Sequence, residues 1–254
     1  MTEPRYRAIA DELESEIAHL RPGARLDSEH TLMRRFGVGR SAARGAVQEL
    51  ERRQRVRRVQ GSGTFVSNRI DYVISLDRRP SWHRTVRDAG AVPRAVVLDH
   101  ALAPLPPDGA RHLEVPAGTL AHRLLRLSFI NDAVAGLTSE WIAHPAVPDL
   151  AAGLRVEESL DEVLRQMGHV RSVRSWCRTA SDIPPPDVQD RLELTTAVPV
   201  WVVESVNRDA DTGAALTYSK AWMRGDAVRV VMEIGDTPAP HPTGAPNTKE
   251  VEPL

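Results

Sequence analysis

Cysteine, lysine and aromatic residues are scarce in this chain. Its single cysteine, Cys177, excludes an internal disulfide and a thiolate zinc site, and it fits a reducing cytoplasm. Aromatic residues make up only 4% of the sequence, so the core must consist mainly of Val, Leu, Ala and Ile. No apolar run approaches the roughly 18 residues that a membrane span needs. The acidic N-terminal segment also lacks the apolar stretch of a signal peptide. We therefore expect a cytoplasmic protein without a membrane partner.

Positive charge is unevenly distributed, and arginine carries almost all of it, because the only lysines are Lys220 and Lys249. The net charge is −1, yet residues 1–70 contain 14 arginines against 9 acidic residues. The rest of the chain contains 19 basic (33 − 14) and 25 acidic (34 − 9) residues. A basic N-terminal third joined to an acidic remainder indicates that the two parts have different partners.

The N-terminal third has the element order of a winged helix-turn-helix. Apolar residues at helical spacing predict a helix over 4–20, and Ser28 is a good N-cap for a second helix. A tight turn over 37–39 precedes a third helix, about 40–54. Two alternating segments, 56–59 and 64–66, then flank a glycine-containing hairpin loop. This order places the third helix where it can enter a major groove.

Arginine side chains on the third helix are the first candidates for DNA contacts. Arg40 and Arg44 are four residues apart and share one helix face, and arginine can donate two hydrogen bonds to guanine. Ser41 can reach a phosphate or a base, while Arg57 and Arg58 at the base of the wing suit phosphate contacts. An alternative interpretation is that Arg40 and Arg44 are solvated side chains on an ordinary surface helix.

Three motifs make the resemblance specific. The segments 22–29 (PGARLDSE), 36–44 (FGVGRSAAR) and 61–66 (GSGTFV) resemble the GntR family of bacterial transcription factors. The resemblance implies that Arg40 and Arg44 read bases and that the wing tip, Gln60 and Gly61, approaches the minor groove. His30 stands where many members carry a DNA-contacting arginine. Asp27, Gly39 and Ala42 depart from the family pattern, which leaves the operator sequence open.

Beyond residue 68 the periodicity changes to that of an α+β domain on an antiparallel sheet. We expect a linker over 68–80, a second domain over 81–235 and a disordered, proline-rich tail over 236–254, after a DNA-binding domain over 1–67. Strands are expected over 95–98, 121–129, 137–143, 198–207, 216–223 and 228–234. Helices are expected over 82–89, 159–167 and 186–192.

This second part resembles the UTRA effector domain of the HutC subfamily, which shares its fold with chorismate lyase. The resemblance covers roughly residues 79–235. It implies a fold class of α+β: an N-terminal winged helix-turn-helix followed by an antiparallel-sheet effector domain. It argues against the all-helical, metal-holding effector domain of other GntR members. The dispersed histidines likewise argue against a metal site, and we predict neither metal nor cofactor.

Three features suggest a pocket for a small anion. Ser81, Trp82 and His83 open a short helix whose free N–H groups can bind an oxyanion. Arg126 lies on an apolar strand and can clamp an oxyanion, and Ser159 caps another helix. An alternative interpretation is that the serines only cap helices and that Arg126 pairs with Glu140.

The sugar-phosphate-sensing members of the subfamily extend this list of candidates. By resemblance, Arg126 matches the first arginine of their phosphate-binding Arg-x-Arg pair and Ser128 replaces the second. Glu140 matches one of their ligand glutamates, and Thr217 replaces another. Because the polar lining differs, an amino-sugar phosphate is disfavoured, and a phosphonate, inorganic phosphate, a carboxylate or another polar metabolite stays open.

We therefore expect a homodimeric regulator that binds an inverted repeat of double-stranded operator DNA and a small-molecule effector. One winged unit reads too few base pairs for useful specificity, and the second domain is the expected dimer interface. A second hypothesis is that the C-terminal domain only dimerises. A third is a lyase-like enzyme, against which no nucleophile–base pair, phosphate loop or carboxylate dyad is found. The sequence names no catalytic residue, effector or target gene, and does not distinguish repression from activation.

Overall fold

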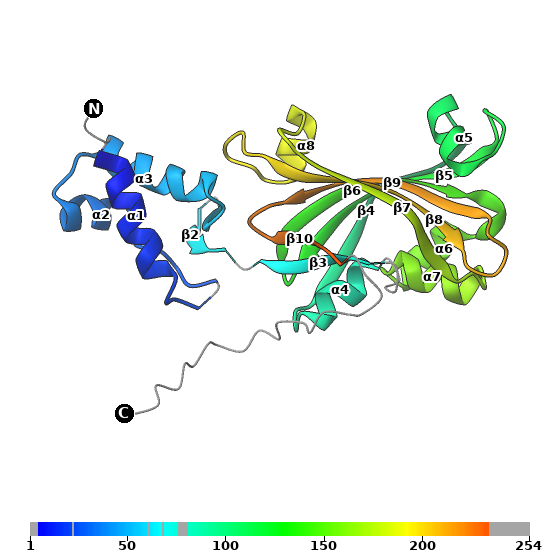
Figure 1. Ribbon diagram of the computed structural model, residues 1–254, viewed down its shortest axis with the longest axis horizontal. Coiled ribbons are helices and arrows are strands. Elements are labelled where there is room, and N and C mark those ends of the chain that lie inside the picture. The colour runs from blue at the N-terminus through cyan, green and yellow to red at the C-terminus, as the bar shows by residue number, and fades with distance from the viewer. Residues whose placement is uncertain (1–4, 22, 60, 68, 76–80, 234–254) are drawn as a thin grey trace.

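The computed structural model describes residues 5–21, 23–59, 61–67, 69–75 and 81–233. It consists of an N-terminal unit (residues 5–67) and a larger sheet unit (residues 69–233), which lie end to end in Figure 1. The expected tail over 236–254 lies outside the described residues, as does Gln60. Among the described residues, every helix is too short or too polar to cross a membrane.

The N-terminal unit contains three helices and a hairpin in the predicted order: α1 (Arg5–Ile17), α2 (Glu29–Phe36), α3 (Arg40–Arg52), β1 (Val56–Val59) and β2 (Gly63–Val66). Ser28 caps α2, because its Oγ accepts a hydrogen bond from the Thr31 amide at 3.2 Å. The apolar faces of the helices meet in one core that includes Leu13, Leu32, Val47 and Leu50. This core fixes α3 at the surface of the unit.

The sheet unit is built on an antiparallel sheet, as the sequence predicts. The sheet has six strands in the order β4-β5-β6-β9-β8-β7. The strands are β4 (Pro93–Pro104), β5 (Leu120–Ile130), β6 (Ala133–Ala143), β7 (Ser172–Asp182), β8 (Val200–Asp209) and β9 (Ala215–Arg224). Turns at 131–132 and 211–213 connect β5 to β6 and β8 to β9.

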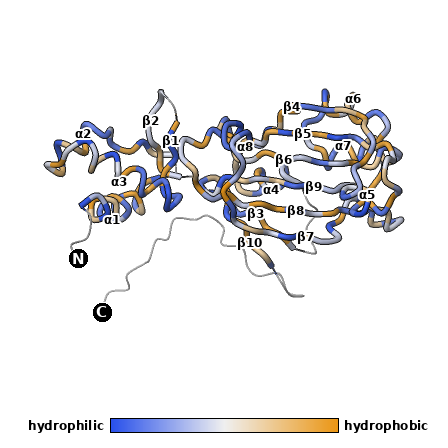
Figure 2. Tube along the Cα trace, turned by 90° about the horizontal axis from the view of Figure 1, so that it is seen from above, coloured by the Kyte–Doolittle hydropathy of each residue, from blue (hydrophilic) through white to orange (hydrophobic). Residues whose placement is uncertain are grey.

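Helices cover the two faces of the sheet differently. Figure 1 shows α5 (Pro107–Leu113) and α8 (Pro186–Arg191) on one face, near opposite ends. On the other face lie α4 (Trp82–Asp88), α6 (Leu150–Val156) and α7 (Leu160–Met167), with the short 3-10 helix η1 (His144–Ala146) leading to α6. Figure 2 shows apolar and polar residues alternating along the strands. Each face of the sheet therefore has its own apolar core.

The segment after the wing differs from the sequence prediction. Residues 70–74, expected to be linker, form β3 (Ile70–Ile74), which pairs in parallel with β10 (Val228–Met232). β10 was expected to join the antiparallel sheet, but it belongs to this separate ribbon. The reason is burial, since Ile70 and Val228 pack together in one apolar cluster. The chain that leaves the wing is thus a paired strand of the sheet unit.

Direct contacts join the two units. The Gln54 amide donates to the Pro199 carbonyl oxygen at 3.3 Å, and Thr195 Oγ1 donates to Glu51 Oε1 at 2.9 Å. The loop that carries these partners is held by Arg224, which donates to the carbonyl oxygens of Leu192 at 2.6 Å and Glu193 at 3.2 Å. The end of β9 therefore supports the surface on which the N-terminal unit rests.

Candidate functional site

The first candidate surface is the exposed N-terminal turn of α3. The Arg40 side chain is 79% exposed, and its ion-pair partner Glu29 is 4.0 Å away. Ser41 and Arg44 are exposed on the following residues of the helix, and His30 is exposed on α2. The buried residues of α3, among them Ala43 and Val47, point the other way. This turn is therefore open to a base edge or a phosphate.

The wing presents its tip but not its arginines. Gly61 is exposed with a φ of +74°, a conformation that glycine adopts without strain, and no atom lies within 4 Å of where a side chain would start. Arg57, in contrast, is only 13% exposed and pairs with Glu193 of the sheet unit at 3.3 Å. Arg58 donates to Glu29 at 3.2 Å and is 19% exposed.

In this arrangement carboxylates engage both Arg57 and Arg58, and their contact with phosphate stays a prediction. Burial, and then the charge of Arg224, lower the pKa of Arg57. In this arrangement the Arg57 guanidinium contacts the sheet unit. No local pattern in the sequence indicates this contact, because the partner Glu193 is 136 residues away.

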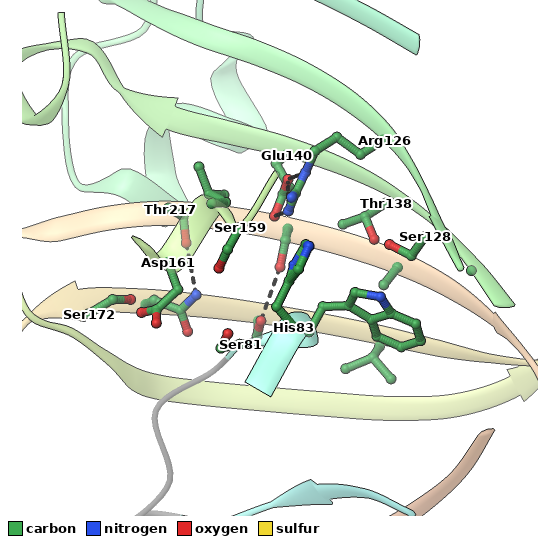
Figure 3. A pocket seen from close by; sticks show the side chains of 18 of the residues that line it. Ser81, His83, Arg126, Ser128, Thr138, Glu140, Ser159, Asp161, Ser172 and Thr217 are labelled. Carbon is green, nitrogen blue, oxygen red and sulfur yellow. Dashed lines mark hydrogen bonds and ion pairs between the residues drawn. The ribbon is translucent and has the colours of Figure 1, made fainter. Parts of the chain in front are cut away.

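The second candidate site is a pocket between the sheet and the helices α4 and α7, which we call the central pocket (Figure 3). Its empty volume is about 850 Å³, with the open mouth included. All eight residues predicted for effector binding line it: Ser81, Trp82, His83, Arg126, Ser128, Glu140, Ser159 and Thr217. Much of the remaining lining is also polar: Tyr72, Thr138, Asp161, Ser172, Arg174, Ser205, Asn207 and Ser219.

Arg126 and Glu140 form a bidentate ion pair in this pocket. Arg126 Nε donates to Glu140 Oε2 at 2.9 Å, and Nη2 donates to Oε1 at 3.1 Å. Each side chain is 9% exposed. The Arg126–Glu140 pair that the sequence offers as an alternative is thus present, and both residues line the pocket. Glu140 balances the charge of Arg126, while guanidinium N–H groups beyond this pair stay available to a ligand.

The short helix α4 contributes three of the predicted residues. Ser81 Oγ accepts from the Arg84 amide at 3.3 Å, so Ser81 is the N-cap. Trp82 Nε1 donates to the Phe129 carbonyl oxygen at 3.3 Å, which anchors α4 to β5. His83 is buried, and burial is the main cause of its lowered pKa, followed by the charge of Arg126. A neutral imidazole therefore lines the pocket at neutral pH.

Serine and threonine hydroxyls surround these groups. Ser159 caps α7 by accepting from the Glu162 amide at 3.4 Å. Thr217 on β9 accepts from the Asn207 side-chain amide at 2.9 Å. Within the described residues, no group of three or more His, Cys, Asp and Glu side chains is placed to hold a metal ion. The pocket suits a small ligand with several hydrogen-bonding groups.

Sequence reasoning missed two elements of this lining. Tyr72 lies on β3, which was taken as linker, and Arg174 lies on β7, which was not predicted as a strand. Arg174 Nη2 donates to the Tyr72 hydroxyl at 3.2 Å. An alternating pattern over 172–176 was the available signal, because Ser172 and Arg174 line the pocket two residues apart.

Comparison with known families matches both units. The model described as "UTRA domain" matches residues 88–229, and the model described as "Bacterial regulatory proteins, gntR family" matches residues 5–66. The first match alone covers more than half of the chain. GntR regulators bind DNA, and UTRA domains bind small-molecule effectors.

Similar proteins extend over nearly the whole chain. The HTH-type transcriptional regulator GgaR of Escherichia coli K12 is 25% identical over 232 residues, which cover 91% of each chain. The probable transcriptional regulator PhnF of the same strain is 29% identical over 236 residues, covering 90% of this chain and 95% of PhnF. Among solved structures, PhnF from Mycobacterium smegmatis superposes with a TM-score of 0.60 at 20% identity. The superposition covers 90% of this chain and 100% of the PhnF chain, and it shows that the two folds are alike.

Proposed function

Because the chain belongs to the UTRA-domain regulators with a GntR-type DNA-binding unit, we propose that it is a homodimeric repressor of the HutC type. It binds an inverted-repeat operator and is released by a small polar metabolite that carries an anionic group. The observation that carries this proposal is the central pocket, which holds all eight predicted effector residues on a unit joined directly to the DNA-binding unit.

Dimerisation follows from the size of the DNA-binding surface. A single exposed helix turn with Arg40, Ser41 and Arg44, together with His30 and the tip at Gly61, reaches only a few base pairs. A twofold dimer doubles these contacts and requires two half-sites in an inverted repeat. Gln60, the other predicted wing-tip contact, lies outside the described residues. A repressor of this kind acts by occupying its operator until the metabolite binds.

The lining of the central pocket supports the ligand class. Hydroxyls and an amide outnumber the charged groups, which favours a ligand with several donors and acceptors. Arg126 keeps unpaired N–H groups beside its ion pair, so it can hold one edge of a phosphonate, phosphate or carboxylate. Glu140 then accepts from a neighbouring hydroxyl of the ligand, and the Thr217 hydroxyl donates to another.

The test starts from operator DNA selected from genomic fragments with the full chain. Fluorescence anisotropy then measures release by methylphosphonate, glycerol 3-phosphate, inorganic phosphate and lactate, and sedimentation velocity measures the oligomeric state. We expect a dimer at micromolar concentration and release by at least one of these anions. A monomer that binds one asymmetric half-site contradicts the dimer. A dimer that binds the operator yet responds to none of these anions favours a C-terminal unit that only dimerises.

A paired variant tests the pocket within this function. The double variant Arg126→Gln, Glu140→Gln removes both charges without leaving one of them buried alone. We expect it to bind the operator like the parent and to lose the response to the anion. Arg123→Gln is the matched control, because Arg123 lies on the same strand, is half exposed and pairs with Asp99. A double variant that releases DNA at the parent's anion concentration refutes the role of this pair.

A further inference from the structure

One end of the central pocket contains two buried polar atoms without a hydrogen-bond partner. They are Arg174 Nε, a donor, and Asn207 Oδ1, an acceptor. The residues face each other on neighbouring strands, since Arg174 of β7 pairs with Asn207 of β8, and Asn207 pairs with Thr217 of β9. Burial of an unpaired polar atom costs free energy, and both residues line the pocket, so a ligand that bonds to these two atoms would remove that cost.

The charge of Arg174 points the same way. Arg126 is held by the bidentate carboxylate of Glu140, but no carboxylate of the described residues lies within ion-pair distance of Arg174. Its other contacts are the Tyr72 hydroxyl at 3.2 Å and the Tyr72 ring, 5.9 Å from the guanidinium carbon. Arg174 is thus a pocket cation without an ion pair among the described residues, and the Asp161 carboxylate lines the same pocket.

We propose that Arg174 and Asn207 form a subsite, separate from Arg126, that recognises an oxyanion bearing a neighbouring hydroxyl or N–H group. This deepens, and rests on, the proposed function. Arg174 Nε donates to the oxyanion, and Asn207 Oδ1 accepts from the group on the adjacent carbon. The Asn207 amide is already fixed in orientation, because its Nδ2 donates to Thr217 Oγ1 at 2.9 Å. Phosphonate and carboxylate share this chemistry, and the experiment separates them.

The same arginine connects the subsite to the DNA-binding unit. Tyr72 lies on β3, which begins at Ile70, shortly after the wing strand β2 ends at Val66. An anion that draws the Arg174 guanidinium toward itself alters the hydrogen bond to Tyr72. The position of β3, and with it the wing, then depends on the occupied subsite. Tyr72 is accordingly a positioning residue rather than a ligand contact.

Calorimetric titration of the full-length protein tests the subsite with matched pairs of probes. Hydroxymethylphosphonate is compared with methylphosphonate, and lactate with propionate. We expect the hydroxylated member of one pair to bind about tenfold more tightly, since it alone satisfies Asn207. Asn207→Ala should remove this preference, and Arg174→Gln should weaken both members of that pair about tenfold or more. The pair of probes that shows these effects, phosphonates or carboxylates, identifies the class of anion that the subsite binds.

Two controls separate the subsite from other sources of anion binding. Arg178→Gln changes another arginine of β7, one that lines a different hollow, and should leave the titration unchanged. The double variant Arg40→Ala, Arg44→Ala removes anion binding by the DNA-binding helix and should also leave it unchanged. The subsite is overturned if Arg174→Gln binds every probe like the parent, or if the parent binds none of the four.

Measurement of operator release distinguishes anion binding at the subsite from its coupling, through Tyr72, to the DNA-binding unit. With the pair that binds, Tyr72→Phe should keep probe affinity within about threefold, because it removes only the hydroxyl that accepts from Arg174. The same variant should need a higher occupancy to release operator DNA. Unchanged release in Tyr72→Phe overturns the coupling. An Arg174→Gln protein that is released by the anion as readily as the parent refutes the subsite, while the proposed function stands.

Discussion

The arginines of the exposed turn of α3 and those buried in the sheet unit lie in opposite environments. On α3, the Arg40 side chain is 79% exposed, and its one ion-pair partner within the described residues, Glu29, is 4.0 Å away. In the sheet unit, Arg126 and Arg224 are buried, and each is held by a bidentate carboxylate, Glu140 for the first and Asp226 for the second. Exposure leaves a cation free for DNA, whereas burial requires a fixed partner. The environment of each arginine, rather than its residue type, therefore indicates its task.

The largest effect on stability should come from removing the carboxylate partner of a buried arginine. Glu140→Ala strands the Arg126 charge in the pocket lining, and we expect it to cost about 3–5 kcal/mol of unfolding free energy. The double variant Arg126→Met, Glu140→Met should be close to neutral, since it removes the charges together. Urea unfolding followed by circular dichroism measures both. A Glu140→Ala protein as stable as the parent would show that solvent screens this pair.

An exposed arginine should affect DNA binding instead of stability. We expect Arg44→Ala to weaken operator binding by about 1–3 kcal/mol and to relax base preference at one position of each half-site. Its unfolding free energy should change by no more than about 0.5 kcal/mol. Arg52→Ala, at the far end of the same helix and paired with Glu49, is the control. Equal binding of operator and random DNA by Arg44→Ala and the parent would contradict the orientation of α3.

How much of the fold and of the pocket could be predicted depends on how far apart in the sequence the contacting residues lie. The N-terminal unit was predictable because its elements depend on nearby signals, such as the Ser28 cap and the apolar spacing of α1. The ribbon of β3 and β10 was not, since its paired residues Asp71 and Arg229 are 158 positions apart. Most pocket residues were found from local features, namely the starts of two helices and Arg126 on an apolar strand, and the others by resemblance. Arg174, which neither a helix start nor a motif marks, was missed.

Gly45 shows the same limit within the N-terminal unit. Glycine in the interior of α3 is expected to weaken that helix by about 0.5–1 kcal/mol relative to alanine. In the structure, a side chain starting at Gly45 would lie 3.3 Å from Tyr6 Cβ and Cγ. The glycine therefore permits close packing of α1 on α3, a contact that helix propensity alone does not reveal.

Arg57 combines a largely buried guanidinium with an exposed carboxylate partner, so its replacement should change stability less than the loss of Glu140 does. Its ion pair with Glu193 joins the units, and because Glu193 is largely exposed we expect Arg57→Ala to cost no more than about 1 kcal/mol of stability. Glu193→Gln removes the same contact without touching the cation. If Arg57 serves only the contact between units, both variants should leave the salt dependence of DNA binding unchanged. A flatter salt dependence in Arg57→Ala alone, measured by anisotropy, would confirm Arg57 as a phosphate contact.

The smallest effect concerns buried histidines, since it vanishes at neutral pH. Burial lowers the pKa of His83 and of His122, so each binds a proton less readily in the folded chain than in the unfolded one. The unfolded state therefore takes up more protons as the pH falls below about 6.5, and stability decreases over that range while staying unchanged above it. Melting temperatures between pH 5 and 8 measure this slope. His83→Gln should reduce it, whereas replacement of the exposed His30 should not. A slope that His83→Gln leaves intact assigns the effect to His122, which donates or accepts at His100, His144 and Val147.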